Sequence, residues 1–504
     1  MNRIQKIVLL IILICATVLS GYVIFMSYFA VSSFWLDIFY GLILCAVLYL
    51  VALALKRMYF NRRRIFYISL FLCVTLSRIL WIIGYPTTPQ GDHVNFHVIA
   101  SYLADNNSWA ILRDAGVLGY ATYFTHIMSF SGVLSKIYYI FGNHSLAGQM
   151  FNVLLVGLSA VIFFKAVSQR FSIEISISST LIYAFIPSFF LYSTLVGGEP
   201  LFMFLFSICL YLGQKIQSLS FSFFLSAALA FCMVLANLIR PLGIILLLAF
   251  LIDSFINQNW SDFIKKMGTL VVVYVCLIMC QPLINHFIYK IPVASNTVGY
   301  SLYVGGDEKS EGRYSADDME EFLFLLPHSR ENAIKQNKKL FTNINNQLFG
   351  LGIQRYEKMA TNGKLLNHFG KKMEHLYFED IDYGVRWAML SHVGTASTWN
   401  LEKNQTQVSD LSNGFLIVIL ILNFGTSLLA FRQKDNRKLA IFFLLQLGFT
   451  CTFMLVEVQA RYQIPFLFSL SLLAMYFPAT IRDLIKNKIH SKKENLHYEN
   501  NDSI

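Results

Sequence analysis

Long, uninterrupted apolar runs are the feature that most constrains this chain. A helix needs about 20 apolar residues to cross the hydrocarbon core of a bilayer, and about twelve runs approach that length. Backbone N–H and C=O groups find no water inside a bilayer, so each run must form a helix. We therefore predict an all-α polytopic membrane protein. The predicted spans are 7–31, 34–55, 65–84, 146–164, 173–194, 199–214, 220–237, 241–256, 268–288, 412–431, 439–457 and 463–480.

The composition excludes a water-soluble fold. The 504 residues are 56% hydrophobic and only 14% charged, whereas soluble domains carry about 25% charged residues. Lipid must therefore solvate the remaining apolar surface. The net charge of +11 comes from short basic clusters between apolar runs, which indicates membrane topology rather than nucleic-acid binding. All eight cysteines lie in apolar runs, so we expect no disulfide framework.

The basic clusters also predict the orientation of the chain. Lys and Arg concentrate in cytoplasmic loops, and with a cytoplasmic N-terminus every cluster falls inside. Two long segments then lie outside, 85–145 and 289–411. The second is long enough for a small soluble region, with amphipathic helices expected at 316–326 and 330–348. The polar tail from Arg482 is expected to be cytoplasmic and partly disordered.

These predictions divide the chain into six parts. They are 1–84 with the first three spans, the outer segment 85–145, 146–288 with spans four to nine, the outer soluble region 289–411, 412–480 with the last three spans, and the tail 481–504. The first run, 7–31, is longer than the ~7–15 residues of a signal-peptide core. We therefore interpret it as a retained helix.

Four polar motifs share the predicted outer face. They are the segment from Tyr85 to Ala100, which contains Asp92 and His93, then Gly197-Gly198-Glu199-Pro200 between spans five and six, Asn237-Leu-Ile-Arg240-Pro241 between spans seven and eight, and Glu457-Val-Gln-Ala-Arg461-Tyr462-Gln-Ile-Pro465 between spans eleven and twelve. Carboxylates and guanidiniums thus lie at one depth, on turns far apart in the sequence.

This set of side chains suits one kind of reaction. A carboxylate can remove a proton from an acceptor hydroxyl. Arginine can bind a phosphate with two hydrogen bonds and stabilise the charge that grows on it as it leaves. A hydroxyl that attacks a sugar carried on a lipid phosphate needs both groups. Because nucleotide sugars are not supplied outside the cell, an external sugar transfer needs a membrane-borne donor.

The acidic and histidine residues also have structural interpretations, which the sequence leaves open. Asp92 could cap the helix that follows it, and Glu199 could cap span six. His93 and His97 lie four residues apart on one helix face, which suits a metal ion. Because no third ligand follows at a fixed spacing, we expect no metal site.

The arginines have comparable alternatives. Arg240 could be a turn residue that extends its charge toward water. Arg461 could form a structural ion pair with Glu457 at helical spacing. Arg78, near the outer end of span three, is expected to extend toward the membrane surface or to face the site.

The first motif resembles that of a known family. The arrangement is similar to the GT-C superfamily of membrane glycosyltransferases, within it the family 39 branch of bacterial aminoarabinose transferases and protein O-mannosyltransferases. Those enzymes carry an acidic pair in the first long external loop, where a juxtamembrane helix begins. Asp92 matches the first acid, and Phe96 and Ala100 suit the helix pattern. His93 stands where the family usually has Glu, so the role of the second acid is not carried over.

The later motifs extend the resemblance. Glu199-Pro200 resembles an acidic turn of the family, Arg240-Pro241 its Arg-Pro turn, and Ala460-Arg461-Tyr462 its late Arg-Tyr motif. The stretch 303–313 looks like uncharacterised Gram-positive members. The resemblance covers most of the chain in topology, but in residues it rests on short motifs.

The resemblance implies a mechanism. The donor would be a polyprenyl-phosphate-linked sugar, transferred with inversion, and Asp92 would be the catalytic general base. Arg240 and Arg461 would hold the phosphate, Tyr462 would line the site, and Glu199 would orient a sugar. His93 is included among the expected substrate-binding residues, and the second outer segment would cover the site and select the acceptor.

The resemblance also implies partners and location. The acceptor would be a cell-envelope glycan, lipid or protein, and the chain would sit in the bilayer of a bacterial plasma membrane with its active site outside. We expect no cofactor, no metal and no nucleic acid.

Three other classes of function remain open. A transporter or lipid flippase would place ionisable residues at mid-membrane and show inverted symmetry, and few charges lie within the predicted spans. A polymerase or ligase of cell-surface polysaccharide would share the donor and the outer site but would move a whole glycan. A non-catalytic scaffold or sensor would need none of the outer motifs.

Overall fold

The structure is a computed structural model. It describes residues 2–31, 33–106, 108–114, 118, 121, 123–219, 221–289, 297–325, 338–378, 383–393, 400–433 and 436–501, apart from the side chains of 323–325, 338–341 and 487–501. These residues form helices, with one isolated bridge between Thr87 and His392 and no strand among them.

The helices follow the apolar runs. Their bounds are α1 Arg3–Ala30, α2 Phe34–Asn61, α3 Arg63–Gly84, α4 Asp92–Asn106, α5 Trp109–Asp114, α7 Thr125–Phe141, α8 Ser145–Val167, α9 Ile173–Phe185, α10 Pro187–Tyr192, α11 Glu199–Ser218, α12 Phe223–Ile239, α13 Gly243–Asn257, α14 Trp260–Ile278, α15 Gln281–Phe287, α16 Val298–Gly305, α17 Ala316–Leu325, α19 Lys338–Thr361, α20 Leu365–Phe378, α21 Gly384–Ser391, α22 Gln405–Ala430, η2 Asn436–Leu439, α23 Ala440–Leu455, η3 Ala460–Phe466 and α24 Leu467–Asn501.

The predicted all-α polytopic architecture is confirmed. Within the described ranges, nine helical segments are long and apolar enough to cross a membrane, and three shorter apolar helices, α9, α12 and α13, accompany them. Each of these segments coincides with one predicted span. The three shorter helices have 13, 17 and 15 residues, so they are shorter than a typical span of about 20 residues.

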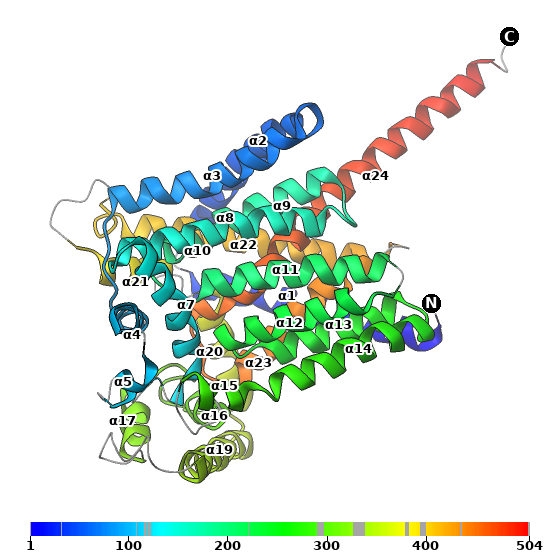
Figure 1. Cartoon of the computed structure of the whole chain (residues 1–504). Helices are drawn as coiled ribbons and strands as arrows, with labels where there is room; N and C mark the ends of the chain where they lie inside the picture. The colour runs from blue at the N-terminus through cyan, green and yellow to red at the C-terminus, as the bar shows by residue number, and fades with distance from the viewer. Residues whose placement is uncertain are drawn as a thin grey trace.

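The helices that belong to the two long outer segments gather at one end of the bundle. In Figure 1 the long helices run side by side, α4, α5, α17, α19 and α21 collect at the left-hand end, and both termini lie at the right-hand end. This arrangement matches the predicted topology, in which both termini share one side and the two long segments share the other.

Proline divides the fifth predicted span. The run 173–194 is not one helix, because α9 ends at Phe185 and α10 begins at Pro187. Proline has no N–H to donate and disfavours helical geometry in the residue before it. Ile186 accordingly has φ −56° and ψ 119°. The break lets the chain turn inward before the Gly197-Gly198 turn that leads into α11.

Two predictions about the polar segments need correction. The polar composition of the tail from Arg482 predicts partial disorder, but α24 continues as a helix to Asn501. The helix expected at 330–348 is α19, Lys338–Thr361, and 330–337 lie outside the described residues. The other predicted outer helix is α17, within one residue of its expected end.

Arg78 does not extend toward the membrane surface. It is fully buried, its Nε donates to the hydroxyl of Ser193 at 2.8 Å, and its Nη2 donates to the carbonyl of Ala184 at 2.6 Å. The guanidinium also lies 4.8 Å from the ring of Phe190. Arg78 therefore ties α3 to the broken fifth span, where proline leaves carbonyl groups without helical partners.

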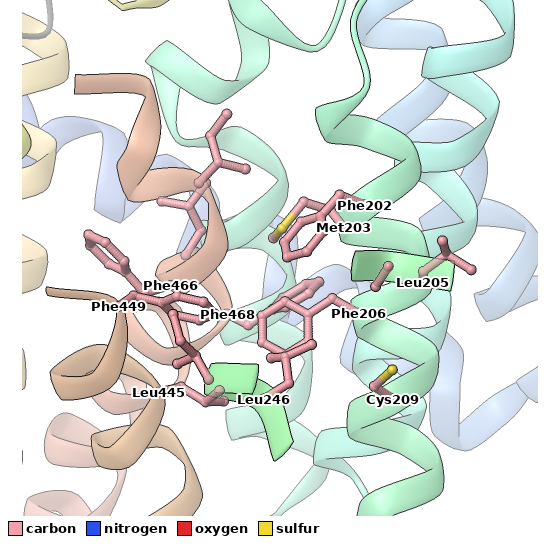
Figure 2. Close-up of a cluster of buried hydrophobic side chains, with 14 of the residues drawn as sticks. Phe202, Met203, Leu205, Phe206, Cys209, Leu246, Leu445, Phe449, Phe466 and Phe468 are labelled. Atoms are coloured by element: carbon pink, nitrogen blue, oxygen red, sulfur yellow. The ribbon is translucent and has the colours of Figure 1, made fainter. Parts of the chain in front are cut away.

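A plug of apolar side chains fills the bundle where α11, α13, α23 and α24 meet (Figure 2). The ring of Phe206 lies 6.1 Å from that of Phe449 and 5.4 Å from that of Phe468, and all three side chains are fully buried. Phe206 is about two helical turns from the outer end of α11 at Glu199. Apolar side chains therefore close the bundle beneath its outer end.

Candidate active site

A cavity of about 460 Å³ lies at the end of the bundle where the helices of 85–145 and 289–411 gather. Its walls come from α4, α7, α11, the turn between α12 and α13, α16, and the segment between α23 and η3. Five of the six predicted site residues line it, namely Asp92, Glu199, Arg240, Arg461 and Tyr462. The four distant turns therefore meet at one cavity.

Asp92 pairs directly with Arg461 in the lining of this cavity. The Nη2 atom of Arg461 donates to Oδ2 of Asp92 at 2.6 Å. Asp92 is the first residue of α4 and follows Gly91, whose φ of +54° is a left-handed conformation that glycine adopts without strain. A Cβ atom at Gly91 would also lie 2.9 Å from the ring of Trp387. This turn therefore aims the carboxylate into the cavity instead of capping the helix.

The charge of Asp92 is set by its partners. Burial alone raises the pKa of this carboxyl, but the charge and hydrogen bond of Arg461, together with His93 and Arg240, lower the pKa below its ordinary value. Half of the side chain (51%) remains exposed to the cavity. Asp92 is therefore ionised at neutral pH and accessible to a ligand.

Glu199 and Arg240 form the second ion pair of the cavity. The Nη2 atom of Arg240 forms an ion pair with Oε1 of Glu199. The same oxygen also accepts from the hydroxyl of Tyr192 at 3.0 Å. The turn before Glu199 is held by Asn152, whose amide donates to the carbonyls of Leu195 and Gly197 at 2.6 and 3.0 Å. The Oε2 atom of Glu199 is buried and has no hydrogen-bond partner among the described residues.

Arg461 is fixed from several sides but keeps a free donor. Its guanidinium lies 5.0 Å from the ring of Trp387 and 5.9 Å from that of Tyr462. Its side chain is only 8% exposed, and within the described part of the chain its Nε atom has no hydrogen-bond partner. A buried N–H without a partner costs about 1–3 kcal/mol. This Nε–H is therefore available to a ligand atom that accepts a hydrogen bond.

The structural ion pair between Arg461 and Glu457 does not form. Glu457 accepts instead from the amide of Gln459 and, at 3.4 Å, from the hydroxyl of Tyr462. The helical spacing does not apply, because η3 begins only at Ala460. Burial raises the pKa of Glu457 above its ordinary value. Arg240 likewise turns into the cavity toward Glu199 and not toward the membrane surface.

His93 is the predicted site residue that does not line the cavity. Its ring is fully buried, and Nδ1 lies 2.6 Å from the carbonyl of Val196. Burial, followed by the charge of Arg461, lowers its pKa to about 4, so the ring is neutral. His97 contacts the hydroxyl of Tyr138 at 2.7 Å. The two rings therefore bind different partners, and no group of three potential metal ligands occurs in the described ranges.

A family comparison now bears on this geometry. Residues 130–286 match the model of the family described as dolichyl-phosphate-mannose-protein mannosyltransferase. The resemblance to GT-C glycosyltransferases is confirmed. The matched segment contains the Glu199 and Arg240 turns, whereas Asp92 and Arg461 lie outside it. No curated protein matches the chain. The chain is thus a multi-pass membrane protein similar to family 39 glycosyltransferases.

Sequence reasoning missed several residues of this GT-C-like cavity. His126 lines it from α7, and burial together with the charge of Arg240 lowers the pKa of this ring to about 3. Tyr300 and Tyr314 line it from the second outer segment. A histidine in the first turn of an amphipathic helix gives little signal, and the tyrosines belong to a segment whose placement depends on packing alone. Asn95, one turn along α4 from Asp92, could have been found from its helical spacing.

Proposed function

We propose that this protein transfers a single sugar from a polyprenyl-phosphate donor to a cell-envelope acceptor at the outer face of a bacterial plasma membrane, with inversion of the anomeric centre. One observation carries the proposal. Two arginine–carboxylate pairs, Arg461–Asp92 and Arg240–Glu199, line one cavity of about 460 Å³ at the outer end of the bundle. The family match supports the donor class.

The arginines provide the phosphate site in this proposal. Arg461 carries a buried Nε donor that has no partner among the described residues, and Arg240 enters the cavity from the opposite turn. Guanidiniums bind phosphate oxygens bidentately and stay charged at any physiological pH. Two of them can stabilise the charge that develops on the leaving polyprenyl phosphate.

Donor binding would also activate the base. Arg461 holds Asp92 and lowers its pKa, which makes the carboxylate a weak base. A donor phosphate competes for the same guanidinium, so its binding frees Asp92 and lets the pKa rise. The acceptor hydroxyl oxygen then bonds to the anomeric carbon while its proton passes to Asp92. The bond between that carbon and the phosphate oxygen breaks, and its electron pair leaves on polyprenyl phosphate.

The other lining residues would orient the reacting groups. Glu199 holds Arg240 with one carboxylate oxygen and offers the other, Oε2, to a sugar hydroxyl. Tyr462 lies beside Arg461 and Glu457. Tyr300 and Tyr314 of the second outer segment line the cavity, where an acceptor would enter. Cavities of roughly 300–1,000 Å³ suit small ligands, which supports transfer of one sugar over transfer of a glycan chain.

The apolar plug favours an enzyme over a transporter. Phe206, Phe449 and Phe468 fill the bundle beneath the cavity. The polar lining therefore ends well before the cytoplasmic side, as expected for a site that exchanges substrates with the outer face only. A transporter or flippase would have to repack this plug in every cycle.

The first prediction tests the base. Asp92→Asn keeps the size of the side chain but removes its ability to accept a proton, so transfer from a radiolabelled lipid-linked sugar in proteoliposomes should fall by about 10²–10⁴-fold. Asp105→Asn, an exposed position on the same helix, is the matched control and should transfer at the wild-type rate. Wild-type transfer by Asp92→Asn would refute the assignment of the base.

A further inference from the structure

A buried lysine lies directly behind one wall of the cavity. Lys372, on α20, is fully buried. Its Nζ atom donates to the carbonyl of Gly305 at 2.9 Å, to the carbonyl of Val456 at 2.6 Å and to the hydroxyl of Tyr356 at 3.2 Å. All three acceptors are uncharged, and no carboxylate in the described ranges forms an ion pair with this ammonium group.

The carbonyl of Val456 belongs to the loop that precedes the cavity residues. The next residue, Glu457, lines the cavity, and Arg461 follows four residues later. The N–H of Glu457 donates to the carbonyl of Ser301 at 2.8 Å, and the N–H of Val458 donates to that of Gly312 at 2.9 Å. The outer segment therefore holds this loop, 456–459, through its main chain.

Two further contacts join the same parts of the chain. The hydroxyl of Tyr356 donates to the carbonyl of Leu455 at 2.9 Å. Gly305 packs so closely on the loop that a Cβ atom there would lie 2.4 Å from the carbonyl carbon of Val456. Lys372 lies where these contacts converge, because it donates both to Gly305 and to Val456. Its ammonium group thus links the outer segment to the loop.

The burial of this lysine is costly. Desolvation lowers the pKa of Lys372 to about 7, even though the charge of Glu457 acts in the opposite direction. The other titratable groups nearby are Tyr356 and His368, whose Nε2 atom also contacts the carbonyl of Gly305 at 2.9 Å. A buried charge that does not pair with a carboxylate needs several hydrogen bonds to persist. The three acceptors supply them only while the loop stays in place.

We propose that Lys372 is a positioning residue that holds the 456–459 loop against the outer segment and so places Arg461 opposite Asp92. This inference rests on the proposed function only for its kinetic readout. Its structural readout is the protection of the Glu457 and Val458 amides from hydrogen exchange, which requires no sugar transfer.

The test compares three lysine variants of the full-length protein in nanodiscs. Lys372→Met removes the donors and should raise the exchange rate of the two amides at least tenfold. It should also raise KM for the lipid-linked sugar about tenfold or more, since small displacements of a binding group are costly. Lys372→Arg retains donors for both carbonyls and should recover most of the protection and of the affinity. Lys371→Met, the neighbour whose 41%-exposed side chain pairs with Glu374, should match the wild type.

A second variant guards against misfolding of the first. Gly305→Ala pushes the same loop away through Val456, while Gly350→Ala on α19 meets no atom within 4 Å. Gly305→Ala should reproduce the loss of amide protection and the higher KM, and Gly350→Ala should not. Unchanged protection in both Lys372→Met and Gly305→Ala would overturn the positioning role. A different result would separate the two proposals. If Lys372→Met and Gly305→Ala lose amide protection but no protein, including the wild type, transfers sugar, the proposed function is refuted and the positioning role stands.

Discussion

At the scale of single residues, each guanidinium in the cavity already holds a carboxylate. The Arg461–Asp92 pair joins positions 369 residues apart, and the Arg240–Glu199 pair joins two turns of different helix pairs. The sequence predicted these four residues as a group because their turns share one side of the membrane. It could not predict which carboxylate each arginine would bind, since local spacing favoured Glu457 for Arg461. Only the folded bundle, which brings the start of α4 next to η3, decides that question.

The second prediction concerns pH. Asp92 acts as a base only when ionised, so the rate is lost as the pH falls through its pKa. In the free enzyme Arg461 lowers that pKa, whereas a bound donor phosphate would occupy Arg461 and let the pKa rise. The acid limb of kcat, which reports the bound state, should therefore lie at higher pH than the acid limb of kcat/KM, which reports the free enzyme.

Arg461→Gln supplies the control for the pH profiles. It removes the charge that lowers the pKa of Asp92, so the acid limb of kcat/KM should move to higher pH and approach that of kcat. Coincident limbs in the wild-type enzyme would show that donor binding leaves Asp92 unchanged.

At the scale of elements, hydropathy predicted each described helix that is apolar enough to cross a membrane, and local chemistry determines where several of them begin or end. Pro187 breaks the fifth span, and Ser172 and Ser222 begin α9 and α12 by accepting from the N–H groups of Ile175 and Leu225. Which helices approach each other closely is set by small residues. The contact between Gly41 of α2 and Gly414 of α22 could not be predicted from periodicity, because apolar membrane helices show no polar face that marks their partners.

The third prediction tests that contact. A Cβ atom at Gly414 would lie 1.7 Å from the carbonyl oxygen of Asp37, so Gly414→Ala must separate α2 from α22. Overpacking of this kind costs about 1–3 kcal/mol. We expect a lower Tm in thermal unfolding in detergent. Gly268→Ala on α14, where no atom lies within 4 Å, should unfold at the wild-type Tm. Equal Tm values for the two variants would contradict the close packing.

At the scale of the whole molecule, hydropathy and basic clusters alone predict twelve spans and place the two long segments on one side of the membrane. The way in which the outer segments cover the cavity does not. The second outer segment joins the first where Thr88 donates its N–H to the carbonyl of Ser391 at 2.7 Å, and it places Trp387 beside Arg461. Such contacts depend on the final packing of helices that are far apart along the chain, and no short motif indicates them.

The fourth prediction tests the orientation of the whole chain. A cysteine at Leu366, which is 82% exposed on α20, should react with a membrane-impermeant maleimide on intact cells. A cysteine at Asp483, whose side chain is 63% exposed near the other end of the bundle, should react only after the membrane is opened. The unsubstituted protein gives the background, because seven of its eight cysteines lie within helices and Cys280 lies in the exposed turn between α14 and α15. The reverse labelling pattern would place the cavity in the cytosol.

The short helices beside the cavity have a consequence for the surrounding lipid. At 1.5 Å per residue, the 17 residues of α12 and 15 residues of α13 span about 26 and 23 Å, less than the ~30 Å of hydrocarbon in a typical bilayer. These two helices are therefore shorter than the hydrocarbon layer is thick, and the lipid beside them must thin to match them. Arg240 stands in the turn that joins these helices, so under the proposed function a cell that lengthens or shortens its fatty acids would change how easily the donor phosphate is reached.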